Sequence, residues 1–299
     1  MRRGTQNSQA PDGEPLIRIV HPSDFSKPSR VAFAHALKIA LLSKAELEIL
    51  HVQSAQLGSE RDAHWTEFPG VRATLARWNI LPAGAKVEDV AQTGLRAKKI
   101  LHSDSDPLES MVRYCAEHPP DLLVLAIHQR EGISRWLHKP VAEPLARRSR
   151  AMTLFVPSRG KGFISPANGA VTLRRILIPV DHQPTAQAAL EEAYFLATGL
   201  SCSEVEFRLL HVGDEQAMPS LSLPHRPDWQ WQERLVPGDA VERILEEDAA
   251  WKPDLIVMAT QGHMDFLDAL RGSTTERVLR AARCPVLAVP EQPANQTDR

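Results

Sequence analysis

The chain of 299 residues has room for two domains, each large enough to bury its own core. Apolar residues make up 43% and charged residues 24% of it, as in ordinary globular proteins. The net charge of -2 gives no reason to expect nucleic-acid binding. No apolar run approaches the ~18–20 residues that a membrane-spanning helix needs. Three scattered cysteines (Cys115, Cys202 and Cys284) fit neither a disulfide framework nor a zinc pattern, so we expect a reducing, cytoplasmic location.

The first half of the chain alternates short apolar runs with segments of helical periodicity. The pattern predicts strands at residues 16–20, 47–52, 98–101, 122–127 and 152–156. It predicts helices at residues 29–42, 60–80, 107–118 and 141–148, and residues 83–97 fit neither type. Residues 1–14 hold two arginines without an apolar core after them, which predicts a disordered tail and no signal peptide.

The same pattern starts again after residues 158–172, whose Gly, Pro and Ser content indicates a linker. Strands are predicted at residues 175–180, 205–212 and 255–258, with a last run ending at Pro290. Helices are predicted at residues 184–200 and 237–247, and from Ser273 through Leu279. We therefore expect a first domain at residues 15–157, a second at residues 173–290, and a C-terminal tail at residues 291–299.

The two halves are copies of one another. His51 and His211 end matching strands 160 positions apart, whereas Asp121 and Asp254 precede matching strands 133 positions apart. The first half thus carries 27 extra residues between its second and fourth strands, where residues 60–80 have helical periodicity. In the second half a polar, Pro-rich segment and the pair Trp229 and Trp231 stand there instead, and the tryptophans are predicted to cover the sheet or a partner surface. Each of the two histidines is predicted to be hydrogen-bonded within its own repeat.

Strands that alternate with helices of 10–15 residues predict parallel βαβ units with right-handed crossovers. The fold class is therefore α/β, with two tandem doubly wound, Rossmann-like domains, each with a mostly parallel five-stranded sheet. Ligands of such sheets bind outside the carboxyl ends of the strands, at the switch point. Asp181 and the turn at residues 259–262 follow strands directly and belong to that edge.

The turn itself has features of an anion site. The strand at residues 255–258 breaks at Ala259-Thr260-Gln261-Gly262, and nine residues later Gly272-Ser273 open a helix. Free N–H groups and the positive end of the helix dipole favour an anion there, and Ser273 with Glu276 fits a capping box. The simpler alternative is that the glycines only turn the chain and Ser273 only caps the helix.

Four stretches, ILIPVD, LLHV, DLIVMATQG and GSTTERVLRAARCPVLAVP, resemble the universal stress protein (UspA) family. The resemblance covers both halves, so the chain is similar to a tandem two-domain member. Nucleotide-binding members of that family carry an Asp after the first strand and the pattern G-x-x-G-x(9)-G-[ST]. The second half keeps this spacing and replaces only the first glycine, by Ala259. That methyl group matters if the position needs a positive φ or a close approach of phosphate.

The resemblance implies an adenine nucleotide alpha hydrolase-like fold and a site for ATP or another adenine nucleotide, with Mg²⁺ arriving with the nucleotide. It places Asp181 at the ribose or adenine and Gly262, Gly272 and Ser273 at the phosphates. His263 either approaches a phosphate or is an exposed loop histidine. The expected binding residues are Asp181, Ala259, Gly262, His263, Gly272, Ser273 and Thr274. No catalytic residue and no protein metal site is expected.

The first half departs further from the pattern. Its turn reads Ala126-Ile127-His128-Gln129, and Lys139-Pro140 stand where the second half has Gly-Ser. Gln129 cannot replace a glycine at positive φ without strain, and Pro140 has neither N–H nor hydroxyl to offer. We expect this half to be structural or to form a docking surface.

The function expected from these features is that of a stress-response regulator which binds an adenine nucleotide in its second domain without significant turnover. The alternative is a scaffold or chaperone-like stress protein that binds no nucleotide and acts through an unknown protein partner. ATP hydrolysis is the weakest hypothesis, a weak activity at most. In the family that the chain resembles, the last strands commonly pair edge to edge between two domains. The resemblance therefore implies that MTLFVP and PVLAVP pair within one chain, which satisfies both edges and leaves a homodimer open.

Overall fold

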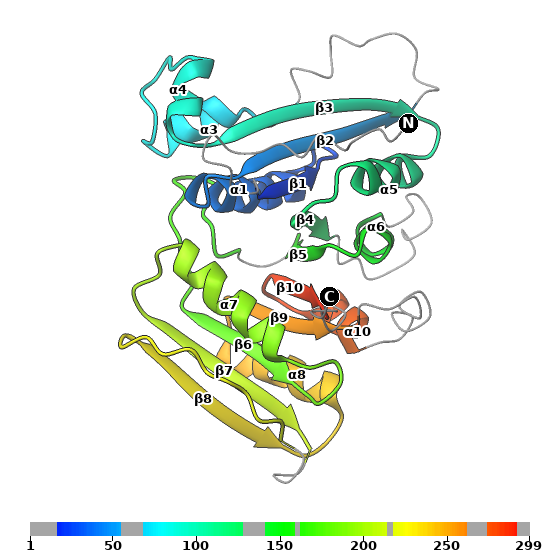
Figure 1. Ribbon diagram of the computed structural model, residues 1–299, viewed down its shortest axis with the longest axis vertical. Helices are drawn as coiled ribbons and strands as arrows, with labels where there is room; N and C mark the ends of the chain where they lie inside the picture. The colour runs from blue at the N-terminus through cyan, green and yellow to red at the C-terminus, as the bar shows by residue number, and fades with distance from the viewer. Residues whose placement is uncertain are drawn as a thin grey trace, which may run out of the picture.

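The computed structural model describes residues 17–54, 68–127, 141–158, 162–213, 218–261 and 274–291. Their strands form one 10-stranded sheet in the order β3-β2-β1-β4-β5-β10-β9-β6-β7-β8. Figure 1 shows the first repeat at one end of this sheet and the second repeat at the other. The two predicted tails and several loops, including residues 262–273, lie outside the described residues.

The first repeat supplies five parallel strands and their helices. Its elements are β1 (Arg18–Pro22), α1 (Lys27–Leu42), β2 (Glu46–Ser54), α3 (Val71–Arg77), α4 (Val87–Gln92), β3 (Arg96–Asp104), α5 (Pro107–Glu117), β4 (Leu122–Ile127), α6 (Ala142–Ser149) and β5 (Met152–Pro157). Strand β3 is longer than the predicted residues 98–101 because it pairs with β2 along its whole length. The helix predicted at residues 60–80 is α3 alone within the described part, and α4 occupies the stretch that fitted neither pattern.

The second repeat has the same plan. Its elements are β6 (Arg175–Val180), α7 (Gln187–Gly199), β7 (Val205–Val212), β8 (Trp229–Val236), α8 (Ala240–Trp251), β9 (Leu255–Thr260), α10 (Thr274–Ala281) and β10 (Val286–Pro290). The sequence pattern gave no location for β8. Trp229 and Trp231 belong to this edge strand, and the ring of Trp231 stacks on Phe207 with centroids 4.1 Å apart. The two tryptophans are therefore part of the sheet, because β8 adds one more strand at its edge.

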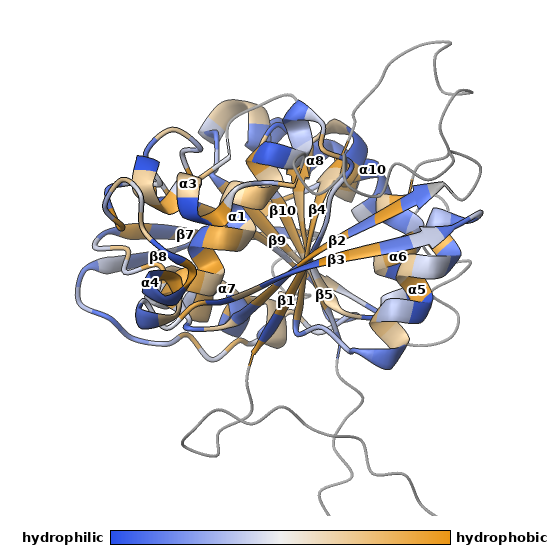
Figure 2. Cartoon of the chain, turned by 90° about the horizontal axis from the view of Figure 1, so that it is seen from above, coloured by the Kyte–Doolittle hydropathy of each residue, from blue (hydrophilic) through white to orange (hydrophobic). Residues whose placement is uncertain are grey.

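Helices cover both faces of the sheet, so each repeat is doubly wound. One core cluster packs α1, α3 and α7 against the strands, through residues such as Leu37, Leu75 and Leu190. The other cluster packs α5, α6, α8 and α10 against the opposite face, through residues such as Leu145 and Ile244. Figure 2 shows the apolar strands crossing the centre with helices around them. The predicted Rossmann-like fold is confirmed.

The repeats join through their last strands. Strands β5 and β10 pair antiparallel, with Phe155 opposite Val286 and Thr153 opposite Ala288. The expected pairing of MTLFVP with PVLAVP within one chain is thus confirmed. Because this junction is antiparallel, the amino-terminal end of β5 lies beside the carboxyl end of β10.

The connection between the repeats is held against the first one. Phe163 and Ile164 are buried in the core on the α1 side. The backbone N–H of Ile164 donates to Nε2 of His35 over 3.2 Å, and Trp78 Nε1 donates to the carbonyl of Pro166 over 3.2 Å. A segment with the composition of a linker is thus part of the folded first repeat.

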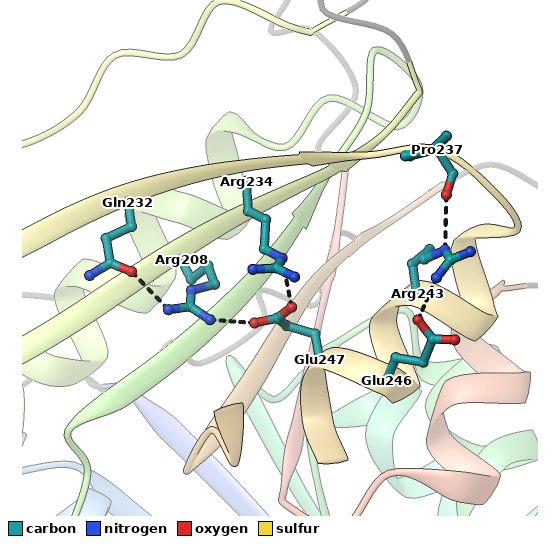
Figure 3. A network of polar contacts seen from close by, with 7 residues as sticks. All are labelled: Arg208, Gln232, Arg234, Pro237, Arg243, Glu246 and Glu247. Carbon is teal, nitrogen blue, oxygen red and sulfur yellow. Dashed lines mark hydrogen bonds and ion pairs between the residues drawn. The ribbon is translucent and has the colours of Figure 1, made fainter. Parts of the chain in front are cut away.

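A buried ion network fastens α8 to the sheet (Figure 3). The carboxylate of Glu247 contacts Arg208 of β7 and lies 2.9 Å from Nε of Arg234 of β8. Arg208 also donates to Gln232 over 2.8 Å and lies 4.1 Å from the ring centroid of Trp251. These contacts offset the cost of removing the charges of Glu247 and Arg208 from water. They fix the helix whose first turns border the cavity described next.

Candidate functional site

A cavity of about 220 Å³ lies at the carboxyl ends of β6, β7 and β9. Strand β6 is flanked by β7 on one side and β9 on the other, so the chain order reverses there. This is the switch point where doubly wound sheets bind ligands. The residues that line the cavity come from these three strands, the turn after β6, and the first turns of α8 and α10: Pro179, Val180, Asp181, Gln183, Pro184, Leu210, Val212, Ala240, Ile244, Met258, Ala259, Thr260, Gln261, Thr274 and Thr275.

Asp181 is the acidic group on the cavity wall. It directly follows β6 and is exposed. Its Oδ1 accepts a hydrogen bond from the backbone N–H of His182 over 2.7 Å, which fixes the carboxylate at the strand end. Within the described part of the chain Oδ2 accepts no hydrogen bond, so it is available to a ligand hydroxyl or amino group.

Two helices begin beside the cavity. Helix α8 is capped by Asp239, whose Oδ1 accepts from the N–H of Glu242 over 3.0 Å, and Ala240 and Ile244 of this helix line the cavity. Helix α10 begins at Thr274, with Thr275 buried in its first turn. The positive ends of both helix dipoles therefore lie near the cavity and favour an anionic ligand.

Ala259, which replaces the first glycine of the motif, lies inside β9 opposite Val289. It is absent from the non-glycine residues with positive φ, so the alanine carries no backbone strain. Its side chain packs against the core on the α7 side of the sheet. Neighbouring Met258 belongs to the opposite face, as expected for alternation along a strand. The added methyl group thus belongs to a partly buried residue that packs against the core and also borders the cavity.

The structure places three of the expected binding residues, Asp181, Ala259 and Thr274, around one cavity. The other four, Gly262, His263, Gly272 and Ser273, lie outside the described residues. Sequence reasoning missed several lining residues, among them Pro179, Gln183, Val212 and Thr275. Pro179 and Val212 stand in the strands ILIPVD and LLHV, so their position at parallel strand ends was a usable signal.

The matching histidines are hydrogen-bonded each in its own repeat, which confirms the prediction. His51 Nδ1 lies 2.7 Å from the carbonyl of Ser23, and His211 Nδ1 lies 2.9 Å from the carbonyl of Val180. Each tautomer with the proton on Nδ1 donates to that carbonyl and ties the end of the second strand to the end of the first. These rings hold the strand ends in place beside the ligand edge.

The first repeat is built differently at the same edge. Phe25, which follows Asp24, has a φ of 61°, and its ring stacks on His51 with centroids 4.1 Å apart. The ring of Phe68 contacts that of Phe25 at 5.1 Å. Aromatic side chains thus pack over the ends of β1 and β2. The residues that replace the motif glycines and serine there, Gln129, Lys139 and Pro140, lie outside the described part.

The described residues contain no group of three or more His, Cys, Asp and Glu side chains suited to a metal ion. None of their helices is long and apolar enough to cross a membrane. Cys115, Cys202 and Cys284 are buried and unpaired, and burial is the main cause that raises the pKa of each thiol. These thiols are therefore poor nucleophiles.

Two Rossmann-like α/β repeats joined through their last strands define a tandem two-domain protein. The chain belongs to the universal stress protein family, because the model of that family matches residues 17–157 and 230–290. The second match begins at β8, the strand that the sequence pattern missed.

Individual relatives agree with this assignment. A universal stress protein of Methanocaldococcus jannaschii is 26% identical over 149 residues, which cover 41% of this chain and 85% of the relative. The solved structure of a universal stress protein from Archaeoglobus fulgidus superimposes with a TM-score of 0.60 at 18% identity, covering 92% of this chain and 96% of that one. A putative universal stress protein from Pseudomonas aeruginosa gives a TM-score of 0.58 at 14% identity, covering 92% and 93%. The two structures share the two-repeat fold over nearly the whole chain.

Proposed function

We propose that the second repeat binds ATP or another adenine nucleotide, with Mg²⁺ carried by the nucleotide, and that the protein acts as a cytoplasmic stress-response regulator. The observation that carries this proposal is the cavity at the ends of β6, β7 and β9, with Asp181 on one wall and the start of α10 on another. The motif begins at Ala259 near the end of β9 and stops one residue before Thr274 at the start of α10, and Ala259 and Thr274 both border this cavity.

The lining supports a division of the ligand into two parts. Pro179, Leu210 and Val212 offer apolar surface at the ends of β6 and β7, which suits a flat base beside the Asp181 carboxylate. Thr274 and Thr275 offer hydroxyl groups at a helix start, which suits phosphate. The nucleotide would therefore lie across the switch point, from β7 toward α10.

The described lining favours binding over turnover. Asp181 is its single carboxylate, and this group stands at the end proposed for the ribose or adenine, away from the phosphates. No histidine, lysine or arginine is among the described lining residues. A group placed to activate water at the phosphates is thus missing from the described wall of this cavity.

Calorimetric titration with ATP and Mg²⁺ tests the proposal. The wild-type protein should bind one nucleotide, and Gly272→Val should abolish binding because the motif allows no side chain at that position. Gly199→Val is the matched control, since a Cβ at Gly199 meets nothing within 4 Å and the residue lies on α7 away from the cavity. Absence of binding by the wild type, or equal binding by Gly272→Val, would refute the proposal. Phosphate release at stoichiometric protein should stay at the background rate.

The second candidate function is the scaffold or chaperone-like role without nucleotide. The aromatic packing of Phe25, His51 and Phe68 over the first repeat's strand ends favours it for that repeat. Under this alternative, neither repeat binds nucleotide and the titration is silent for the wild type.

A further inference from the structure

A second, smaller cavity lies at the seam between the repeats. It has a volume of about 40 Å³ and lies between α6 and α10, over β5 and β10. Thr260, Gln261 and Thr275 line both this seam cavity and the larger one, so the two cavities adjoin. The seam cavity adds two cations from the first repeat, Arg147 and Arg150.

The antiparallel junction brings these arginines to the ligand edge of the second repeat. Thr153 pairs with Ala288, and Pro290 at the carboxyl end of β10 pairs with Thr260 at the carboxyl end of β9. Residues just before β5 therefore lie beside the carboxyl end of β10, one strand away from the carboxyl end of β9. Arg150 caps the carboxyl end of α6 with a φ of 55° and stands two residues before β5.

The described lining of the larger cavity carries one charged residue, the acidic Asp181, whereas the seam cavity is lined by arginines. Phosphate groups are bound best by cations, which the larger cavity lacks among its described residues. In the seam cavity, the acidic groups Glu143 and Glu276 both contact Arg280. Arg150 forms no ion pair with any of the described residues, and its side chain is exposed. It is the cation there that is available to a ligand.

We propose that Arg150 of the first repeat binds the terminal phosphates of the nucleotide held by the second repeat. This inference rests on the proposed nucleotide site and adds its phosphate-binding cation. The base and ribose occupy the larger cavity, and the phosphate chain passes Thr275 and Gln261 toward the seam. The repeat with the degenerate motif thus completes the site of the other repeat.

Arg150 at this place makes the contact between the repeats depend on the length of the phosphate chain. A nucleotide with β- and γ-phosphates contacts both repeats, whereas AMP or adenosine contacts the second repeat alone. A ligand that bridges two parts stabilises their junction by its differential affinity for the joined state. The seam of β5 and β10 would therefore distinguish ATP from AMP, which gives a regulator a means of responding to the energy charge of the nucleotide.

Calorimetry with ATP, ADP, AMP and adenosine tests the role of Arg150. Arg150→Gln should weaken ATP binding about tenfold, the effect expected for one contact with a charged group, and leave adenosine binding unchanged. Arg150→Lys keeps the charge and should lose less. The matched control is Arg148→Gln, because Arg148 stands on the same helix, does not line the cavity, and pairs with Glu109 over 2.8 Å.

The outcomes separate the inference from the function on which it rests. If the wild type binds ATP and Arg150→Gln binds it equally well, the arginine has no role and the nucleotide site stands. If Arg150→Gln weakens the binding of ATP and of adenosine alike, the change has disturbed the fold, and Arg150→Lys then decides. An ATP affinity of Arg150→Lys about tenfold higher than that of Arg150→Gln would support the role of Arg150. Equal ATP affinities of the two variants would overturn it. If the wild type binds none of the four ligands, both proposals fail.

Discussion

The buried carboxylate of Glu247 gives a prediction whose size follows from its surroundings. The side chain is 7% exposed, and its main partner Arg208 is 16% exposed. Glu247→Gln removes the negative charge and leaves Arg208 buried without compensation, a change that costs ~3–5 kcal/mol in comparable buried pairs. Arg208 keeps its hydrogen bond to Gln232 and its place over the ring of Trp251, so we expect the lower end, about 3 kcal/mol.

Urea unfolding followed by tryptophan fluorescence measures this loss, because three of the six tryptophans, Trp229, Trp231 and Trp251, lie in the second repeat. In thermal unfolding, at ~2 °C per kcal/mol for a chain of this size, the Tm should fall by about 6 °C. Neighbouring Glu246 supplies the control, since its side chain is 62% exposed and its pair with Arg243 should contribute little. Glu246→Gln should therefore leave the midpoint nearly unchanged.

Replacing both partners separates charge from packing. Glu247→Leu combined with Arg208→Met removes the uncompensated charge and should recover most of the lost stability. Equal midpoints for Glu247→Gln and Glu246→Gln would refute the reasoning. So would a double variant that is no more stable than Glu247→Gln alone.

Three further predictions concern other parts of the fold. Burial lowers the pKa of His35 to about 4, so the unfolded chain binds its proton first, and His35 should cost at most ~3 kcal/mol of stability as pH drops from about 6.5 to 4. His35→Gln should reduce this pH dependence of unfolding, and the part that stays belongs to His21, whose pKa burial also lowers to about 4. Gly169→Ala should cost ~1–3 kcal/mol in urea unfolding, because φ is +68° and the new Cβ would lie 2.5 Å from a ring carbon of Trp78. Gly199→Ala, on open helix surface, should instead stabilise by ~0.5–1 kcal/mol, and a loss there would contradict the account of both glycines.

The sequence by itself determined the architecture. Apolar runs such as LLVLAI and RILIPV are rich in leucine and β-branched residues and lie between segments whose apolar residues repeat at helical spacing. The bounds predicted for β4 and β6 are therefore the observed ones. The duplication then implied two copies of one fold, and the resemblance to the family implied that their last strands pair. These properties are local or repeated, which is why a single chain reveals them.

Strand β8 shows where local patterns stop. Its residues WQWQERLV are mostly polar, and it becomes a strand because β7 offers a free edge along its length, from Val205 opposite Trp229 to Val212 opposite Val236. The same holds for the connection at residues 162–172, whose composition indicates a linker but whose Phe163 finds a buried place against His35. Both depend on partners far away in the sequence.

At the candidate site the sequence identified the motif, and the tertiary structure decided what the motif residues do. The sequence left open whether the methyl group of Ala259 blocks a phosphate. In the structure, the alternation of side chains along β9 packs this methyl group against the core. Arg150 belongs to the first repeat, and only the antiparallel pairing of β5 with β10 places it at the seam cavity, which adjoins the cavity of the second repeat. Side-chain direction and the juxtaposition of the two repeats are set by pairing register, which no local pattern encodes.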